Sequence, residues 1–147
     1  MSLQIGYIDS EGCARIRIRI SGTFPEVFFD VDALIDTGFT GFLTLPIIQA
    51  LPLGLTLIGT VTSVLADGTT ISSFSAKGTV RLGPDLYLAS LGANATAIYH
   101  MKDKIGIKDE TVEGAITLTG DDVLIGMELL RSLRKSITIG RDMVSLY

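Results

Sequence analysis

The sequence is poor in cysteine, histidine, tryptophan and basic residues. Cys13 is its single cysteine and His100 its single histidine, so no disulfide can form within the chain. The two residues lie far apart in sequence and make no recognisable metal-ligand set or nucleophile–base pair. We therefore expect neither a metal nor a cofactor, and we interpret His100 as a loop residue.

Positive charge is scarce as well. Twelve Lys and Arg against sixteen Asp and Glu give a net charge of -4, and the pI is about 4.8. Proteins that bind DNA or RNA neutralise phosphates with clustered Lys and Arg side chains. The composition therefore argues against a nucleic-acid partner.

No secretory leader or membrane span is recognisable. The start, MSLQIGYIDSEG, lacks a basic stretch followed by an apolar run of about 7–15 residues. Thr37 to Ala66 carries no charge, but glycines and prolines interrupt it before it reaches the roughly 20 apolar residues of a membrane helix. We expect this segment to be buried core, and the protein to be cytoplasmic and without membrane contact.

What is present is the composition of an ordered domain. Hydrophobic residues make up 47% of the chain and charged residues 19%, which differs from the low-hydropathy, highly charged composition of disordered chains. The length of 147 residues fits one domain, and neither a repeat nor a low-complexity linker divides it. We therefore expect a single domain, 1–147.

Two strands are predicted near the start of the chain. From Cys13 to Ile20, apolar residues alternate with Arg15, Arg17 and Arg19, which predicts a half-buried strand with its arginines on the solvated face. The following run, EVFFDVDALID, predicts a strand that ends at Asp36. We expect Asp30 and Asp32 on that strand to face solvent.

Turn and capping residues predict the later elements. Thr44 is a candidate cap and Pro46 the first turn of a helix that Pro52 and Gly54 end. Two Thr/Val/Ile-rich arms, 57–65 and 70–83, flank an Asp-Gly turn and predict a β-hairpin. The remaining predictions are strands at 85–91 and 114–118, a solvated loop at 100–111, a helix at 126–135 and a closing hairpin at 136–147. The expected fold is mostly β with one convincing helix.

The most informative motif is Asp36-Thr37-Gly38, in which an aspartate leaves an apolar strand directly into a Thr-Gly turn. Backbone amides can fix such a carboxylate, and the glycine allows a substrate or another backbone to approach closely. The tripeptide alone is also compatible with a simple turn closed by the aspartate side chain. The surrounding sequence therefore has to distinguish an active-site loop from a simple turn.

That context is Leu124-Ile125-Gly126 followed by a short helix, with the predicted hairpin lying between it and Asp36. The order resembles that of the retropepsin-like aspartic proteases, which include the retroviral proteases and many bacterial single-domain relatives. The resemblance covers roughly residues 13–147 and implies a closed β-barrel with one short C-terminal helix and a flap hairpin. It also implies that Asp36 activates the attacking water.

The resemblance assigns roles to the neighbouring residues too. Thr37 would tie two active-site loops together, and Gly38 completes the active-site loop. The hairpin tip, Ala66, Asp67 and Gly68, would be the flap that closes over the substrate. The supporting segment packed beside the loop would be Leu124, Ile125 and Gly126.

The sequence departs from the family in two places. Residues about 92–113 form an insertion relative to the compact retroviral enzymes, which could decorate or obstruct the cleft. Phe39 follows the motif where two-lobed pepsins usually offer a hydroxyl to the carboxylate. The resemblance therefore implies a less acidic working range than that of pepsin.

The chemistry of the family needs two carboxylates that share one proton. This chain has one Asp-Thr-Gly and no Asp-Ser-Gly, so the second aspartate has to come from a second copy in a homodimer. A peptide or protein would be the substrate. The apolar C-terminal segment 143–147 is a candidate for pairing between subunits, and equally for a strand within one subunit.

Three other interpretations compete with this one. Phe28–Asp32 together with Gly120–Asp122 mimics the acidic motifs of haloacid-dehalogenase-like phosphatases, but that fold needs parallel strands alternating with helices. The segment after Asp36 lacks the Gly-Lys-Ser/Thr of a phosphate-binding loop. The more serious alternative is a catalytically silent member of the same dimeric fold that binds peptides or serves in assembly.

Overall fold

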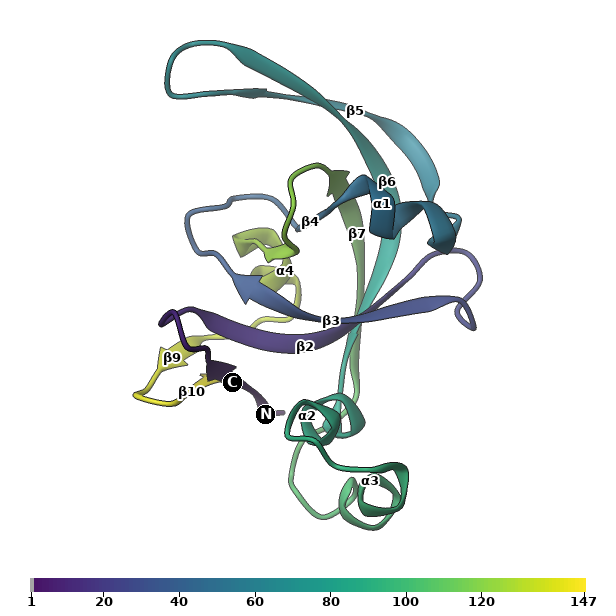
Figure 1. Cartoon of the computed structure of the whole chain (residues 1–147), viewed down its shortest axis with the longest axis vertical. Helices are drawn as coiled ribbons and strands as arrows, with labels where there is room; N and C mark the ends of the chain where they lie inside the picture. Colours follow the sequence, from purple (N-terminus) through teal and green to yellow (C-terminus); the bar gives the residue numbers. More distant parts are fainter. Residues whose placement is uncertain (1) are drawn as a thin grey trace.

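The computed structural model describes residues 2–147, which form one ten-stranded sheet with several short helices (Figure 1). The strands are β1 (Gln4–Ile8), β2 (Ala14–Ser21), β3 (Phe28–Ile35), β4 (Leu43–Leu45), β5 (Thr56–Val64), β6 (Thr70–Leu82), β7 (Glu110–Leu118), β8 (Leu124–Ile125), β9 (Ile137–Ile139) and β10 (Met143–Leu146). The helices are α1 (Ile47–Ala50), the 3-10 turn η1 (Leu51–Leu53), α2 (Pro84–Ser90), α3 (Ala95–Met101) and α4 (Met127–Ser132).

Six of the strands close into a barrel. The strand order is β5-β6-β7-β4-β8-β3-β2-β1-β10-β9, and β6 also pairs with β2. That extra pairing joins the two ends of the run from β6 to β2, so the expected closed β-barrel is confirmed. β5 continues the sheet at one end, and the group β1-β10-β9 continues it at the other.

The barrel core follows from the alternation in β2. Ile16, Ile18 and Ile20 are buried among the other barrel strands, as the period of two predicts. The arginines between them lie on the outer face, but they are not simply hydrated: each pairs with one or two aspartates at 2.7–3.1 Å. Asp30 is exposed, as expected, whereas Asp32 is half-buried, and both carboxylates are paired with arginines of β2.

The helical content exceeds the sequence prediction. Residues 85–91 were expected as a strand, yet Pro84–Ser90 is helix α2. Leu86 and Leu88 are both buried, and their spacing of two residues imitates a strand, whereas Pro84 at the first helical position is the correct signal. The expected loop at 100–111 begins inside helix α3, which Asn94 caps by accepting a hydrogen bond from the Ala97 N–H at 2.9 Å. His100 therefore lies on a helix.

Other expectations hold, with one correction at the first short helix. The hairpin of β5 and β6, helix α4 and the closing hairpin of β9 and β10 all form where they were predicted. Thr44, however, does not cap α1. It lies in β4 and is buried, and the cap position belongs to Pro46, which makes no side-chain capping bond.

The C-terminal strand is used inside the chain. β10 pairs with β1 on one edge and with β9 on the other. The suggestion that 143–147 pairs between subunits therefore fails, because an antiparallel strand has only two edges and both are occupied.

Residues 92–113 lie at the end of the barrel opposite the β5–β6 turn (Figure 1). Gln4 Nε2 donates to the Lys108 carbonyl oxygen at 2.7 Å, and Arg81 pairs with Asp109 at 2.7 Å, so this segment is tied to β1 and β6. Among residues 2–147, no helix is both long and apolar enough to span a membrane.

Candidate active site

Asp36 leaves β3 at the edge of the barrel and enters a tight turn. Its side-chain Oδ1 accepts the Gly38 N–H at 3.0 Å, and its backbone oxygen accepts the Phe39 N–H at 3.1 Å. Asp36 is half-buried, whereas Thr37 and Gly38 are exposed. The turn thus holds the carboxylate by a backbone amide while leaving it open to a reactant.

The segment Leu124–Gly126 lies between β3 and β4 and supports this turn through hydrogen bonds. β8 pairs in parallel with β3 and antiparallel with β4, so it fills the space between the strands that enter and leave the loop 36–42. The Asp36 N–H donates to the Ile125 oxygen at 2.9 Å, and the Met127 N–H donates to the Phe39 oxygen at 2.8 Å. The structure therefore brings together the two sequence motifs that lie about 90 residues apart.

Only glycine fits at position 126, because there is no room for a Cβ atom. A Cβ there would collide with the backbone oxygen of Gly41 and lie 2.6 Å from the Phe39 ring. Its own N–H donates to the Phe42 oxygen at 3.0 Å. Any side chain at 126 would push the loop away from β8.

A cleft of about 590 Å³ lies between the loop 38–42 and the β5–β6 hairpin. Hydroxyl-bearing and apolar side chains of β5, β6 and β7, and of the residues just after β5 and β7, form its walls: Val61, Ser63, Leu65, Ile71, Ser73, Ser75, Ala115, Thr117 and Thr119. Of the described residues that line it, Glu128 alone is charged. None of residues 92–113 contributes, so the insertion does not obstruct this cleft.

The β5–β6 turn next to the cleft is stabilised by hydrogen bonds to the Asp67 side chain and by the conformation of Gly68. Asp67 Oδ1 accepts from the Thr69 hydroxyl at 2.6 Å and from the Thr69 N–H at 3.0 Å, and these bonds lower the pKa of Asp67. Gly68 has φ of 86°, a conformation that favours glycine. The turn predicted at Ala66-Asp67-Gly68 thus forms, and the adjacent Leu65 lines the cleft.

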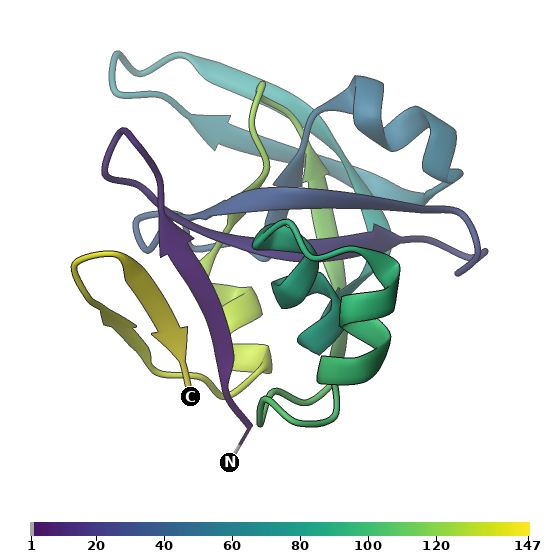
Figure 2. The ribbon, with the colours of Figure 1, turned by 60° about the horizontal axis from the view of Figure 1, so that its bottom comes forward.

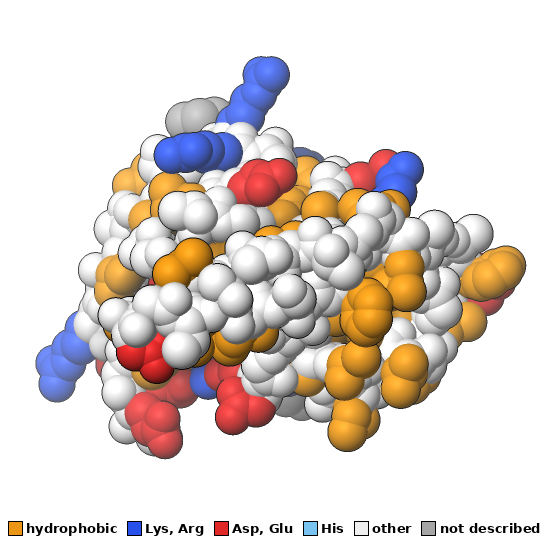
Figure 3. All heavy atoms as spheres, turned by 90° about the horizontal axis from the view of Figure 1, so that it is seen from above, with side chains coloured by type: hydrophobic (Ala, Val, Ile, Leu, Met, Phe, Trp, Pro, Cys, Tyr) orange, Lys and Arg blue, Asp and Glu red, His pale blue; other side chains and the backbone are white. Residues whose placement is uncertain are grey.

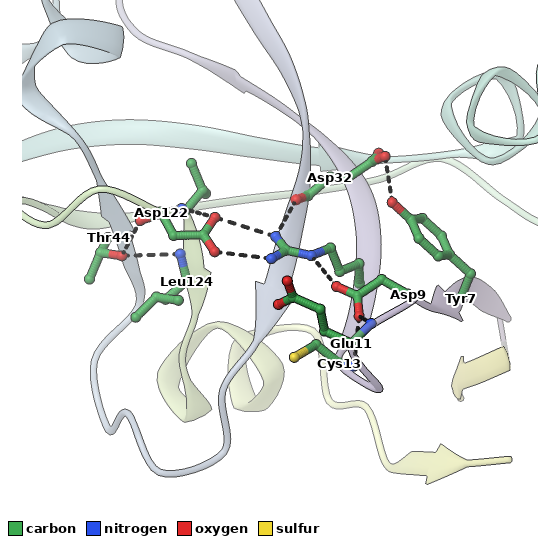
Figure 4. Close-up of polar contacts among 10 residues, drawn as sticks. Tyr7, Asp9, Glu11, Cys13, Asp32, Thr44, Asp122 and Leu124 are labelled. Carbon is green, nitrogen blue, oxygen red and sulfur yellow. Dashed lines mark hydrogen bonds and ion pairs between the residues drawn. The ribbon is translucent and has the colours of Figure 1, made fainter. Parts of the chain in front are cut away.

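An ion network links the outer face of β2 to the segment before Gly126 (Figure 4). The Arg15 guanidinium donates to Asp9 at 2.9 Å and to both oxygens of Asp122 at 3.1 and 3.3 Å. The Thr44 hydroxyl donates to the Asp122 backbone oxygen at 3.2 Å and accepts the Leu124 N–H at 3.0 Å. Arg15 and Thr44 therefore fix the start of β8 from two sides.

Charge and burial shift several pKa values in this network. Burial, followed by the hydrogen bond to Asp32 at 2.7 Å, raises the pKa of Tyr7 to about 12. Burial alone would raise the pKa of Asp32, but hydrogen bonds from Arg17 and Tyr7 outweigh it and lower that pKa. The Cys13 N–H and the Arg15 side chain lower the pKa of Asp9. These carboxylates therefore stay ionised in mildly acidic solution.

Comparison with known proteins finds similarity in three dimensions only. No family model matches the sequence, and no curated protein matches it. Among solved structures, it is similar to a retropepsin-like aspartic protease from Rickettsia conorii, with 17% sequence identity and a TM-score of 0.54. The match covers 99% of this chain and 90% of the other. The chain has a retropepsin-like fold.

In this retropepsin-like fold, the dehalogenase-like alternative loses its structural basis. Asp30 and Asp32 lie on the outer face of an antiparallel barrel strand and bind arginines. The strands do not alternate with helices as that phosphatase fold requires.

Sequence reasoning missed three residues around the site, namely Arg15, Thr44 and Asp122. Their contacts join positions 78 to 107 residues apart, so no local pattern reveals them. Glu128 is exposed on helix α4 and also lines the cleft, a role that the sequence analysis did not assign to it. Its position directly after the Gly126 motif was the signal that could have found it.

Proposed function

We propose that this protein is an aspartic endopeptidase that acts as a homodimer, with Asp36 of each copy forming the catalytic pair. The observation that carries the proposal is the environment of Asp36: its half-buried carboxylate accepts the Gly38 N–H, and the loop that follows it, 38–42, lines a cleft together with the β5–β6 hairpin. The retropepsin-like fold supports the same conclusion.

In the proposed mechanism, the two Asp36 carboxylates share one proton because two like charges about 3 Å apart do not both ionise readily. One carboxylate accepts a proton from the attacking water, and the other donates a hydrogen bond to the scissile carbonyl. The two groups titrate as a coupled pair, which gives an acid and a base in mildly acidic solution. The protein needs no cofactor for these steps.

The neighbouring residues have supporting roles in this proposal. Gly38 holds the carboxylate through its N–H, and Thr37, whose exposure is compatible with this role, contacts the matching loop of the second copy. Leu124, Ile125 and Gly126 keep the loop in position. The turn Ala66-Asp67-Gly68 acts as the tip of a flap over an extended peptide, which lies along the neutral walls of the cleft.

The test compares wild-type protein with Asp36→Asn on a mixed peptide library between about pH 4 and 7. The substitution keeps the size of the side chain but removes the ionisable group, so we expect cleavage to fall at least about 1,000-fold while the dimer stays folded. Asp103→Asn, in an exposed loop, serves as the matched control and should cleave normally. A statine-type transition-state mimic should block the wild type.

Two outcomes would contradict the proposal. Cleavage that persists in Asp36→Asn would show that the carboxylate is not catalytic. A folded wild-type dimer that binds peptides but cleaves none of them would favour the alternative of a silent peptide-binding or assembly module.

A further inference from the structure

The proposed function requires a second copy of the chain, and the inference that follows rests on that requirement. Each chain supplies one Asp-Thr-Gly, so the Asp36 loops of two copies have to meet at a two-fold axis. The strands at the two chain ends are already paired with each other, because β10 lies between β1 and β9. The copies therefore cannot join through β10.

The outer edge of β9 is the open edge at this end of the sheet. Ser136 and Tyr147 exchange two backbone hydrogen bonds, at 2.7 and 3.1 Å, and the Gly140 N–H donates to the Met143 oxygen at 2.8 Å. Thr138 lies opposite Ser145 in the same register. Because antiparallel pairing alternates, the backbone groups of Ile137 and Ile139 point away from β10.

This edge lies on the same side of the molecule as the candidate active site. In Figures 1 and 2 the β9–β10 hairpin, the loop after β3 and the turn between β5 and β6 all reach the left-hand side, and β9 is outermost in Figure 2. A copy added at β9 is therefore on the side where a second Asp36 is needed.

The edge also lacks the features that usually prevent pairing. Natural edge strands carry lysines, prolines or bulges that discourage another chain. Residues 136–140, Ser-Ile-Thr-Ile-Gly, contain neither a charge nor a proline. Ile139 is 62% exposed, so the edge offers apolar surface together with its free backbone groups.

We propose that two copies join through their β9 strands, paired antiparallel about a two-fold axis at Thr138. Ile137 of each copy then lies opposite Ile139 of the other, with about four inter-chain hydrogen bonds. The order β1-β10-β9 continues into the second copy as one sheet across the axis. This contact holds one end of the dimer face, while the Asp36 loops and the β5–β6 turns meet further along it.

A second surface is less suited to this role. An apolar groove of about 290 Å³ lies between α1, η1 and the base of the β5–β6 hairpin, lined by Ile47, Leu51, Leu57 and Phe74 among others. Figure 3 shows hydrophobic side chains gathered towards the right, the side that carries α1 and η1 in Figure 1. Pairing there would leave the two Asp36 loops on opposite outer sides of the dimer.

Disulfide trapping tests both the surface and its register. In a Cys13→Ser background, Thr138→Cys places two thiols directly opposite each other at a non-hydrogen-bonded pair, about 4.5 Å apart at Cα, which suits a disulfide. We expect mild oxidation to give a covalent dimer of twice 15.7 kDa. Ile139→Cys alone should cross-link at least about tenfold less, because it faces position 137, and Ile137→Cys/Ile139→Cys together should restore the dimer.

Ile48→Cys on α1, at 76% exposure, is the control for the other surface. Efficient cross-linking there and not at 138 would overturn the proposal, as would equal cross-linking at 138 and 139. A second variant, Ile139→Lys, adds a charge to the edge without introducing a thiol. It should raise the dimer dissociation constant at least about tenfold in sedimentation equilibrium, whereas Ile48→Lys should not.

The readouts separate this proposal from the proposed activity. A β9-linked dimer that cleaves nothing would support the interface and contradict the peptidase assignment. An active enzyme that resists trapping at 138 and keeps its dimer in Ile139→Lys would do the reverse.

Discussion

The outer face of β2 and the segment from Thr37 to Ala66 adjoin one another but are stabilised by different interactions. On the outer face of β2, three arginines are paired with aspartates of β3 and of the segments next to it. The segment from Thr37 to Ala66, which follows Asp36 and includes β5, has no charged residue. Its first half, up to Leu53, is held by backbone hydrogen bonds and packed against the barrel core, whereas every residue of β5 is exposed, so the expectation that the whole segment is buried is wrong.

This difference separates scaffold from cleft. Half-buried bidentate ion pairs fix geometry, because both partners have to keep one orientation. A neutral cleft wall presents hydroxyl and apolar groups that accept many side chains at little desolvation cost. Asp122 joins the two regions, since its carboxylate binds Arg15 and its backbone oxygen binds Thr44.

The largest effect on stability is expected from the close packing between Gly126 and the uncharged loop after Asp36. Gly126→Ala puts a methyl group against the backbone oxygen of Gly41. Neither the loop 36–42 nor the segment around Gly126 can move aside without losing the hydrogen bonds that join them. We expect a loss of about 3 kcal/mol in the free energy of unfolding, at the upper end for overpacking. Urea denaturation measures it. Gly140→Ala, whose Cβ would lie 3.3 Å from the nearest atom, should cost no more than about 1 kcal/mol.

A second charged cluster, around Lys135, makes a contribution to stability that depends on pH. Lys135 is 4% exposed in its side chain and pairs with Glu110 at 2.8 Å. Burial alone would raise the pKa of Glu110, but hydrogen bonds from Gln4, Lys135 and Ser2 outweigh it and lower that pKa below its ordinary value of 4.5. The pair therefore stabilises the fold above about pH 4.5, and this contribution is lost as pH falls through the lower folded value.

We therefore expect Glu110→Gln to cost about 2 kcal/mol at pH 7, less than for a fully buried pair because the carboxylate is part-exposed and Ser2 still accepts from Lys135. The melting temperatures of variant and wild type should converge as pH is lowered towards 3. Glu113→Gln on the same strand, from an exposed pair 3.7 Å apart, should change little at any pH. A constant difference between Glu110→Gln and wild type across pH would contradict this account.

Arg15→Met tests whether the charged face positions the active-site loop. The change keeps an apolar stem but removes contacts to Asp9 and Asp122, and we expect a cost of about 1–2 kcal/mol. The Asp36 amide, which is bonded to Ile125, should also exchange its hydrogen faster. Arg19→Met loses the ion pair with Asp30 and the stacking on the Phe28 ring, but neither partner contacts β8, so it should leave the Asp36 amide protected. Equal exchange in both variants would show that Arg15 does not act on the loop.

The sequence predicted those features that depend on neighbouring residues. The alternation around Ile18 identified β2, the Asp-Gly pair at 67–68 identified the hairpin, and the apolar run before Asp36 placed that carboxylate at a strand end. Pairing between distant segments was not predictable in this way. Arg15 meets Asp122 across 107 positions, and β10 lies between β1 and β9 because of the whole sheet order. Helix α2 was missed because its buried leucines have a strand-like spacing.

Glu128 offers the smallest effect on stability and the most specific effect on function. It is exposed at the start of α4 and is the one charge among the described residues that line the cleft. If peptides bind there, a single carboxylate in a neutral wall favours a Lys or Arg side chain nearby and disfavours Asp or Glu. We expect Glu128→Gln to change the free energy of unfolding by less than about 0.5 kcal/mol.

The ratio of kcat/KM for basic over acidic peptides should fall about tenfold in Glu128→Gln, because the attraction and the repulsion are removed together. Arg131→Gln, an exposed change on the same helix outside the cleft lining, should leave that ratio unchanged. An equal shift in both variants would show that the preference comes from the net charge of the protein and not from the cleft.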